Sequence, residues 1–162
     1  MEQRINAYEK GKGALQALFG LGIYLSKSPV EKSLLDLVYY RVSQINGCAY
    51  CLDMHSKDLR AAGETEQRLY VLDAWREAPF YTDRERAALA WAEAVTKIMG
   101  GHVPDEVFEE ARAQFSEEEL IDLTLAVTTI NSYNRINIAF SIKAGGYKVG
   151  MHDVRKAQEA VA

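Results

Sequence analysis

Apolar positions recur at helical spacing in several segments of the chain, and each segment is bounded by helix start or stop signals. The clearest example runs from Ser28 to Gly47, where one face carries Leu34, Leu35, Val38, Val42 and Ile45. Ser28 as N-cap, Pro29 in the first turn and Glu31 as the returning acid of a capping box predict the start of this helix. Asn46-Gly47 predicts its end.

The same kinds of signals predict six further helices. In chain order these are about 13–26; about 48–62, ending at Gly63; a short helix capped by Thr65; a helix through 87–98 after the capping box of Thr82 and Glu85; one with Pro104 in its first turn; and a long final helix capped by Ser116. No segment alternates apolar and polar residues for long, and no Asn-Gly turn joins two strand patterns. The sequence therefore predicts an all-α domain over residues 1–162.

Composition and charge narrow the classes of protein that fit. The 162 residues are 48% hydrophobic and 26% charged, as in an ordinary globular domain. The net charge is −4 and no basic run stands out, so we expect no nucleic-acid partner. The most apolar stretch, 120–142, is interrupted by Asn131, Asn134, Arg135 and Asn137, and the N-terminus lacks an apolar leader. We expect no membrane span and a cytoplasmic location.

Cys48 and Cys51 are the only two cysteines, and His55 follows four residues after the second. On a helix the three would share an arc of about 60°. Cys51 and His55 would have Cβ atoms about 5–6 Å apart, and the two cysteines would meet the Cα separation of about 4.4–6.8 Å that a disulfide requires. The start of a helix stabilises a thiolate, and a histidine can act as base or proton shuttle. This pattern predicts a redox-active thiol site.

Two further points stay open at this level. Asp36, twelve residues before Cys48 in an apolar stretch, approaches His55 if the two helices pack antiparallel; an ordinary solvated helix residue is the equal alternative. Two cysteines and a histidine are also zinc ligands, but three ligands on one helix make a poor tetrahedral cage. His102 or His152 would have to supply a fourth ligand from far along the chain. We therefore favour a site without a metal or other cofactor.

The run from Leu37 to His55 resembles the signature of alkylhydroperoxidase D (AhpD)-like proteins, which belong to the carboxymuconolactone decarboxylase superfamily. The likeness is weaker through Arg86 to Trp91 and through Ile130 to Arg135, and it covers about 12–145 altogether. The resemblance implies an all-helical fold, a homo-oligomeric trimer or hexamer, and thiol-dependent reduction of hydroperoxides.

The resemblance also implies roles for individual residues. Cys51 would attack the peroxide, and Cys48 would resolve the resulting sulfenic acid as a disulfide. A dithiol, such as a lipoyl group on a partner protein, would then reduce that disulfide. His55 would relay the proton, with Asp36 standing where the family has a glutamate. Tyr50 stands where the best-characterised members have a second histidine.

Several alternatives stay open. The helix-start argument favours Cys48 as the more acidic thiol, whereas the proximity of His55 favours Cys51; we prefer Cys51, because a base one turn away also supplies a route for the proton. Tyr50 either shapes the pocket or simply packs, and the run 133–135 faces either the site or a subunit interface. The resemblance also implies a ring-opening decarboxylase, like the namesake of the superfamily, as an alternative to a peroxidase. A further alternative is a non-enzymatic redox-sensing or zinc-binding module. The apolar run 120–142 favours an oligomer.

Overall fold

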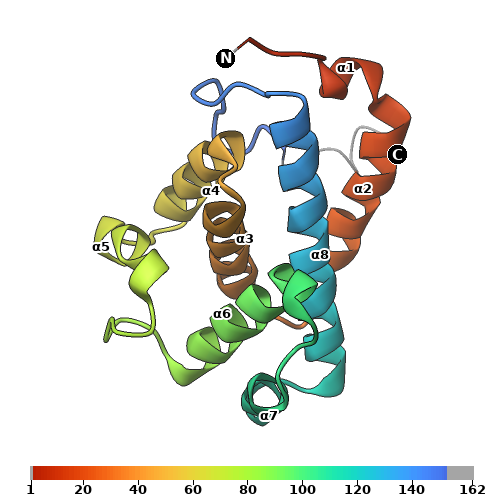
Figure 1. The fold of residues 1–162 in the computed structure, drawn as a ribbon. Helices are drawn as coiled ribbons and strands as arrows, with labels where there is room; N and C mark the ends of the chain where they lie inside the picture. The colour runs from red at the N-terminus through yellow and green to blue at the C-terminus, as the bar shows by residue number, and fades with distance from the viewer. Residues whose placement is uncertain (1, 153–162) are drawn as a thin grey trace.

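The computed structural model describes residues 2–152, except for the side chain of Met99, and this part of the chain is helical without strands. The all-α prediction is confirmed (Figure 1). Within residues 2–152, no helix combines the length and the apolar character that crossing a membrane requires. The elements are α1 Ala7–Lys10, α2 Lys12–Leu25, α3 Lys32–Asn46, α4 Ala49–Ala61, α5 Glu66–Tyr70, η1 Leu72–Ala74, α6 Asp83–Thr96, η2 Ile98–Gly100, α7 Asp105–Gln114 and α8 Glu117–Ala139.

Most of the helix boundaries follow from local signals. Thr82 forms the predicted capping box at the start of α6, and Ser116, the predicted cap of the final helix, forms a capping box with Glu119 at the start of α8. Gly47 ends α3 with φ of 67°, in the left-handed region where a side chain would be strained, and Gly63 follows α4 in the same way with φ of 96°. Thr65 caps the short α5 by accepting a hydrogen bond from Arg68 N–H.

The predicted start of α3 is wrong. The helix begins at Lys32, and its N-cap is Glu31, which makes no side-chain capping bond. Ser28 Oγ instead accepts a hydrogen bond from Val30 N–H at 3.2 Å. Val30 is 3% exposed in the main core, and the Glu31 carboxylate accepts hydrogen bonds from Arg84 on α6. These long-range contacts accompany a non-helical backbone where the local pattern predicts the first helical turn.

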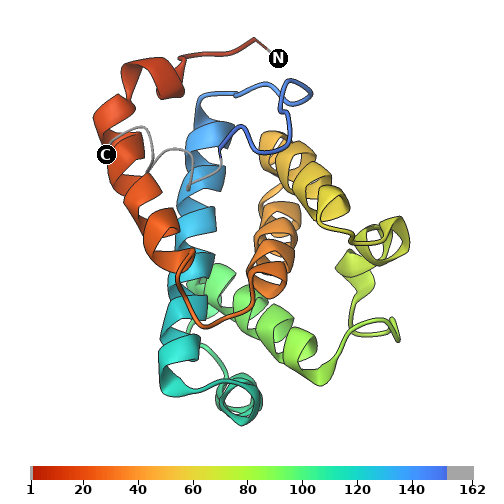
Figure 2. The ribbon, with the colours of Figure 1, turned by 180° about the vertical axis from the view of Figure 1, so that it is seen from behind.

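The main core lies around α3 and α8, which pack side by side through the middle of the molecule (Figure 1). Helix α6 packs against both of them, and α2 lies along α8, as the view from behind shows (Figure 2). Because α8 also contacts α4 and α7, much of the apolar run 120–142 is covered within the chain. Ile121 and Ile138 remain exposed on it, at 69% and 46%. The apolar character of this run is therefore explained largely without a second subunit.

A buried ion pair joins α3 to α6. Arg41 Nε donates to Glu93 Oε1 at 2.9 Å, and both residues are buried. Trp75 and Arg76 also donate to the Glu93 carboxylate, while Arg41 forms a second ion pair with the exposed Asp73. Burial raises the pKa of Glu93, but the donors from Trp75, Arg76 and Arg41 outweigh it and hold that pKa below its ordinary value. Glu93 is therefore ionised in the folded protein.

Candidate active site

The turn between α3 and α4 places the cysteine pair at the start of a helix. Gly47 reverses the chain, and Cys48 takes the N-cap position of α4 with extended backbone. Cys48 Sγ accepts a hydrogen bond from Cys51 N–H at 3.4 Å, so the sulfur occupies the place of a capping oxygen. Both cysteines are 1% exposed. Their predicted position at the start of a helix is confirmed.

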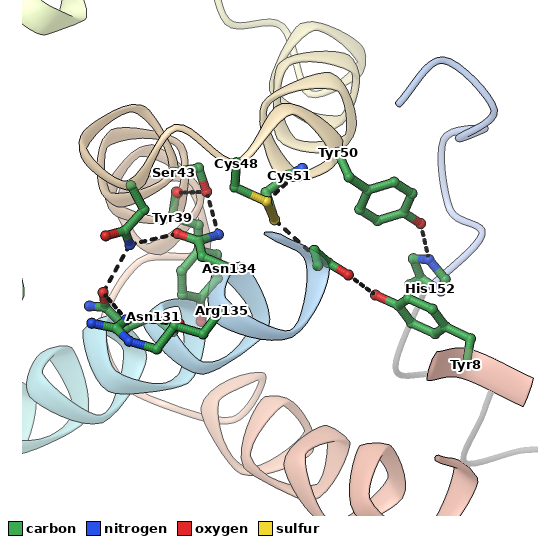
Figure 3. The surroundings of a disulfide bond; sticks show 12 residues. Tyr8, Tyr39, Ser43, Cys48, Tyr50, Cys51, Asn131, Asn134, Arg135 and His152 are labelled. Atoms are coloured by element: carbon green, nitrogen blue, oxygen red, sulfur yellow. Dashed lines mark hydrogen bonds between the residues drawn. A yellow bond between two sulfur atoms is a disulfide. The ribbon is translucent and has the colours of Figure 1, made fainter. Parts of the chain in front are cut away.

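Cys48 and Cys51 are joined as a disulfide, with Cα atoms 5.3 Å apart. The sulfur of Cys51 also has a partner on α8, because Asn137 Nδ2 donates to it at 3.3 Å (Figure 3). Tyr8 Oη donates in turn to Asn137 Oδ1 at 3.2 Å, which fixes the orientation of the amide. A donor aimed at the sulfur stabilises a thiolate there once the disulfide is reduced.

A cavity of about 250 Å³ lies beside Cys51, between α2, α4 and α8. Cys51 borders it and Cys48 does not. No Asp, Glu, Lys or Arg is among the described residues that line it, so its walls are uncharged if its histidines are neutral. The lining side chains are mostly apolar or aromatic, with a few polar groups: Tyr8, Leu15, Phe19, Tyr39, Cys51, Met54, His55, Thr129, Ile130, Tyr133, Asn137 and His152.

His55 lies one helical turn after Cys51 and lines the same cavity. Burial, together with the positive charge of Lys32, lowers the pKa of His55 to about 3, so the imidazole is neutral near pH 7. Its Nε2 is buried and has no hydrogen-bond partner among the described residues. The ring packs against Tyr39, with centroids 5.6 Å apart. A neutral, unpartnered imidazole can accept a proton from whatever binds in the cavity.

Asp36 and His55 border a second cavity, of about 590 Å³, without a hydrogen bond between them among those described. The Asp36 carboxylate pairs with Lys32 on the preceding turn of α3. Burial raises the pKa of Asp36, although the hydrogen bond and charge of Lys32 act against the increase. Asp36 and His55 thus line one cavity, and Cys51 is not among the described residues that line it.

Tyr50 and His152 form a contact that the sequence did not reveal. Tyr50 Oη and His152 Nε2 are 2.8 Å apart (Figure 3). The His152 ring also stacks on Tyr8 and on Tyr147, with centroid separations of 5.7 Å. His152 belongs to the segment after α8, which passes over the first turn of α4 (Figure 2). Tyr50 therefore packs against the C-terminal segment at the rim of the cavity.

The polar run on α8 has two different roles. Tyr133 lines the cavity, whereas Asn134 is fully buried and bonds to Asn46 and Ser43 on α3 (Figure 3). Arg135 is exposed and bonds only to Asn131 among the described residues. The run therefore faces the site through one residue and ties α3 to α8 through the next.

The zinc-binding alternative requires a cluster of metal-ligating side chains. Among residues 2–152, no group of three or more His, Cys, Asp or Glu side chains is arranged to hold a metal ion. Tyr8, Thr129 and Asn137 also line the cavity, and none of them was predicted as a site residue from the sequence. No local pattern marks them, because α1 and α8 meet α4 only through the tertiary fold.

Comparison with known proteins gives a consistent result over most of the chain. A model of the carboxymuconolactone decarboxylase family matches residues 12–94. The uncharacterized protein YdfG of Bacillus subtilis is 42% identical over 144 residues, which cover 89% of this chain and 98% of YdfG. A crystal structure of a protein of unknown function from Agrobacterium tumefaciens superimposes with a TM-score of 0.86 at 41% identity, covering 90% of this chain and all of the other.

A shorter match reaches a protein with a named activity. The alkyl hydroperoxide reductase AhpD of Mycobacteroides abscessus is 38% identical over 79 residues, which cover 45% of this chain and 44% of that protein. The long matches thus share the fold over nearly their whole length, and the short match shares part of it.

Proposed function

The chain belongs to the carboxymuconolactone decarboxylase family as an AhpD-like protein, and on that premise we propose that it is a thiol-dependent peroxidase. It reduces a hydroperoxide to an alcohol and water while a dithiol is oxidised to a disulfide. The observation that carries this proposal is the placement of Cys51 and the unpartnered Nε2 of His55 on one uncharged cavity. The similarity to a named alkyl hydroperoxide reductase supports it.

Cys51 acts as the nucleophile. Its thiolate attacks the terminal oxygen of the hydroperoxide, the O–O bond breaks, and Cys51 becomes a sulfenic acid while an alkoxide leaves. Cys51 borders the cavity and receives the Asn137 N–H, whereas Cys48 does neither. Access and thiolate stabilisation therefore favour Cys51 over Cys48 for this step.

His55 moves the proton. The neutral imidazole takes the proton of the Cys51 thiol and returns it to the leaving alkoxide, so the step releases an alcohol. Burial and Lys32 lower the pKa of His55, so the imidazole is neutral near pH 7 and enters the cycle in its proton-accepting form. Asp36, which shares the second cavity with His55, completes the path to solvent through water.

Cys48 resolves the intermediate. Its thiolate attacks the sulfenic sulfur, the S–O bond breaks, and the hydroxide leaves as water after taking a proton. The position of Cys48 at the N-cap of α4 supports its thiolate form, and the Cα separation of 5.3 Å accommodates the product disulfide. A dithiol such as a protein-bound lipoyl group then restores both thiols by exchange.

The direct test is consumption of an organic hydroperoxide supported by reduced lipoamide. We expect turnover by the wild type and none by Cys51→Ser. Cys48→Ser is the matched control, because it keeps the nucleophile and should consume about one equivalent of peroxide before it stops. Equal turnover by the wild type and Cys51→Ser would remove the proposal.

A ring-opening decarboxylase is the second candidate, since the family carries that name. Its lactone substrate carries carboxylates, which call for cationic side chains, and no Lys or Arg is among the described residues that line the cavity beside Cys51. Such chemistry also does not need two thiols. Activity of a Cys48→Ser/Cys51→Ser double variant on a carboxylated lactone would favour it.

The proposal includes a cytoplasmic homo-oligomer, a trimer or hexamer. The similarity to AhpD-like proteins supports assembly, whereas the exposed Ile121 and Ile138 lie about 25 Å apart along α8 and do not form one apolar patch. Light scattering coupled to gel filtration measures the subunit number. A monomer across the micromolar range would contradict this part of the proposal without affecting the thiol chemistry.

A further inference from the structure

Thr129 differs from the other threonines and the serine on α8. Thr124, Thr128 and Ser132 each donate to a backbone carbonyl three or four residues earlier, at 2.7, 2.9 and 2.9 Å. Thr129 makes no such bond: its Oγ1 is buried and has no hydrogen-bond partner among the described residues. The hydrogen bond from a side-chain hydroxyl to a carbonyl of the preceding turn, which the neighbouring residues make, is thus missing at Thr129.

The other buried side-chain polar atom without a partner in residues 2–152 is His55 Nε2. Both atoms belong to residues that line the cavity beside Cys51. Native proteins pair nearly all buried polar groups, because an unpaired one loses its hydration and gains nothing. Two unpaired groups on one cavity therefore point to a polar ligand that satisfies them.

Thr129 and His55 differ in how far along their helices they lie from the level of the Cys51 sulfur. Thr129, Tyr133 and Asn137 follow one stripe of α8, and Thr129 lies about 12 Å along the axis from Asn137, the residue that bonds Cys51. His55 lies only about 6 Å along α4 from Cys51. His55 can therefore serve the peroxide group, whereas Thr129 marks the end of the cavity remote from the sulfur.

The other residues that line the cavity restrict the chemistry of the rest of a ligand. Leu15, Phe19 and Ile130 supply apolar surface, and no Asp, Glu, Lys or Arg is among the described residues that line the cavity. A carboxylate or ammonium group buried there would lack a counter-charge. A threonine hydroxyl, by contrast, offers one donor and two acceptor positions to a neutral oxygen.

We propose that Thr129 is a specificity-determining residue, and that the substrate is an uncharged organic hydroperoxide with an apolar middle and a second neutral oxygen at its far end. A hydroxyl or carbonyl group fits this description. The inference rests on the proposed peroxidase function and adds which hydroperoxides the site prefers. A site that must hydrogen-bond a substrate oxygen discriminates against the analogue without it, because its own polar group then stays unpaired.

The test compares octyl hydroperoxide with the same compound carrying a hydroxyl group on its terminal carbon. For the wild type we expect kcat/KM to be about three- to tenfold higher for the hydroxylated compound, the range that one net hydrogen bond between neutral groups provides. Thr129→Val, which keeps the shape and loses the hydroxyl, should abolish the preference mainly through KM. Thr129→Ser should retain it.

Thr128→Val is the matched control, because Thr128 is the neighbouring residue, is exposed and already bonds to a carbonyl. It should leave the preference of the wild type unchanged. Reduction of both peroxides with equal kcat/KM, unaltered by Thr129→Val, would overturn the inference and leave the peroxidase standing, with Thr129 holding water only.

A binding measurement separates this inference from the proposed function. Calorimetry of octanediol and of octanol with the disulfide form needs no turnover. Tighter binding of octanediol that is lost in Thr129→Val supports the polar end of the cavity even if neither peroxide is reduced. Equal binding of the two alcohols by the wild type would overturn the inference in that case as well.

Discussion

The side-chain amide of Asn137 donates a hydrogen bond to the sulfur of Cys51 at 3.3 Å, which joins the last turns of α8 to the first turn of α4. Asn137 is 3% exposed, so water does not compete for the contact. A fixed donor at this position stabilises negative charge on the sulfur that borders the cavity, and it does so from a residue 86 positions away in the sequence.

Replacing Asn137 with leucine should slow the reaction of Cys51 at neutral pH. Hydrogen bonds to charged groups contribute about 1.5–3 kcal/mol, so the thiolate should form at a pH about one to two units higher and react roughly tenfold more slowly near pH 7. The measurement is the pH dependence of alkylation by iodoacetamide in a Cys48→Ser background. Tyr8→Phe is the control, because it removes only the bond that orients the amide, and its effect should be smaller.

Burial of His55 should make the folded protein sensitive to acid. Burial and Lys32 lower the pKa of His55 to about 3 from its ordinary 6.5, so below pH 6.5 the unfolded chain binds a proton that the folded chain does not. Stability therefore falls as the pH drops through this window, by about 1.4 kcal/mol per pH unit, until it levels off near pH 3. Urea unfolding between pH 6.5 and 5 measures this loss. The free energy of unfolding of the wild type should fall over this range relative to that of His55→Leu, approaching the slope of about 1.4 kcal/mol per pH unit.

His102→Gln serves as the control for that experiment, since His102 is exposed. Its difference from the wild type should stay constant over the same pH range. A constant difference for His55→Leu as well would mean that His55 is not held neutral by the fold.

The contact between Tyr50 and His152 should appear as a coupling energy. Their hydrogen bond of 2.8 Å attaches the segment after α8 to the first turn of α4. Tyr50→Phe and His152→Ala should each lower the free energy of unfolding, and the double variant should lose less than the two together by about 0.5–1.5 kcal/mol. Strict additivity in a double-mutant cycle would show that the two side chains do not interact in solution.

The buried pair of Arg41 and Glu93 should matter far more than the exposed one on the same arginine. Glu93→Leu leaves the Arg41 charge without its buried partner and should cost about 3–5 kcal/mol in the free energy of unfolding. Asp73, whose side chain is 80% exposed, pairs with the same Arg41, and Asp73→Asn should cost less than about 1 kcal/mol. Chemical denaturation of the two variants compares them directly. Similar losses in the free energy of unfolding would contradict the larger role given to the buried pair.

Local patterns predicted the parts of this protein that depend on neighbouring residues. Two capping boxes, at Thr82 and Ser116, and the left-handed Gly47 fix helix ends through bonds within a few residues. The common placement of Cys51 and His55 likewise follows from one turn of helix. In each case, the interacting groups are so close along the chain that the fold has little freedom to separate them.

Long-range contacts explain what could not be predicted. Ser28 carries a good N-cap signal, but burial of Val30 shifts the helix start to Lys32. Asn137 and Thr129 are polar positions in the mostly apolar sequence of α8. Only the packing of α8 against α4 shows what they face. Their polarity was a visible signal, whereas the partner that explains it lies elsewhere in the chain.

The assignment of the nucleophile is tested most directly by mass spectrometry of the two single cysteine variants after one equivalent of an organic hydroperoxide. We predict sulfenic acid at Cys51 in Cys48→Ser, formed rapidly and in nearly stoichiometric yield, with Cys48 in Cys51→Ser left as the thiol. Sulfenic acid at Cys48 in Cys51→Ser, with none at Cys51 in the reverse variant, would contradict the account.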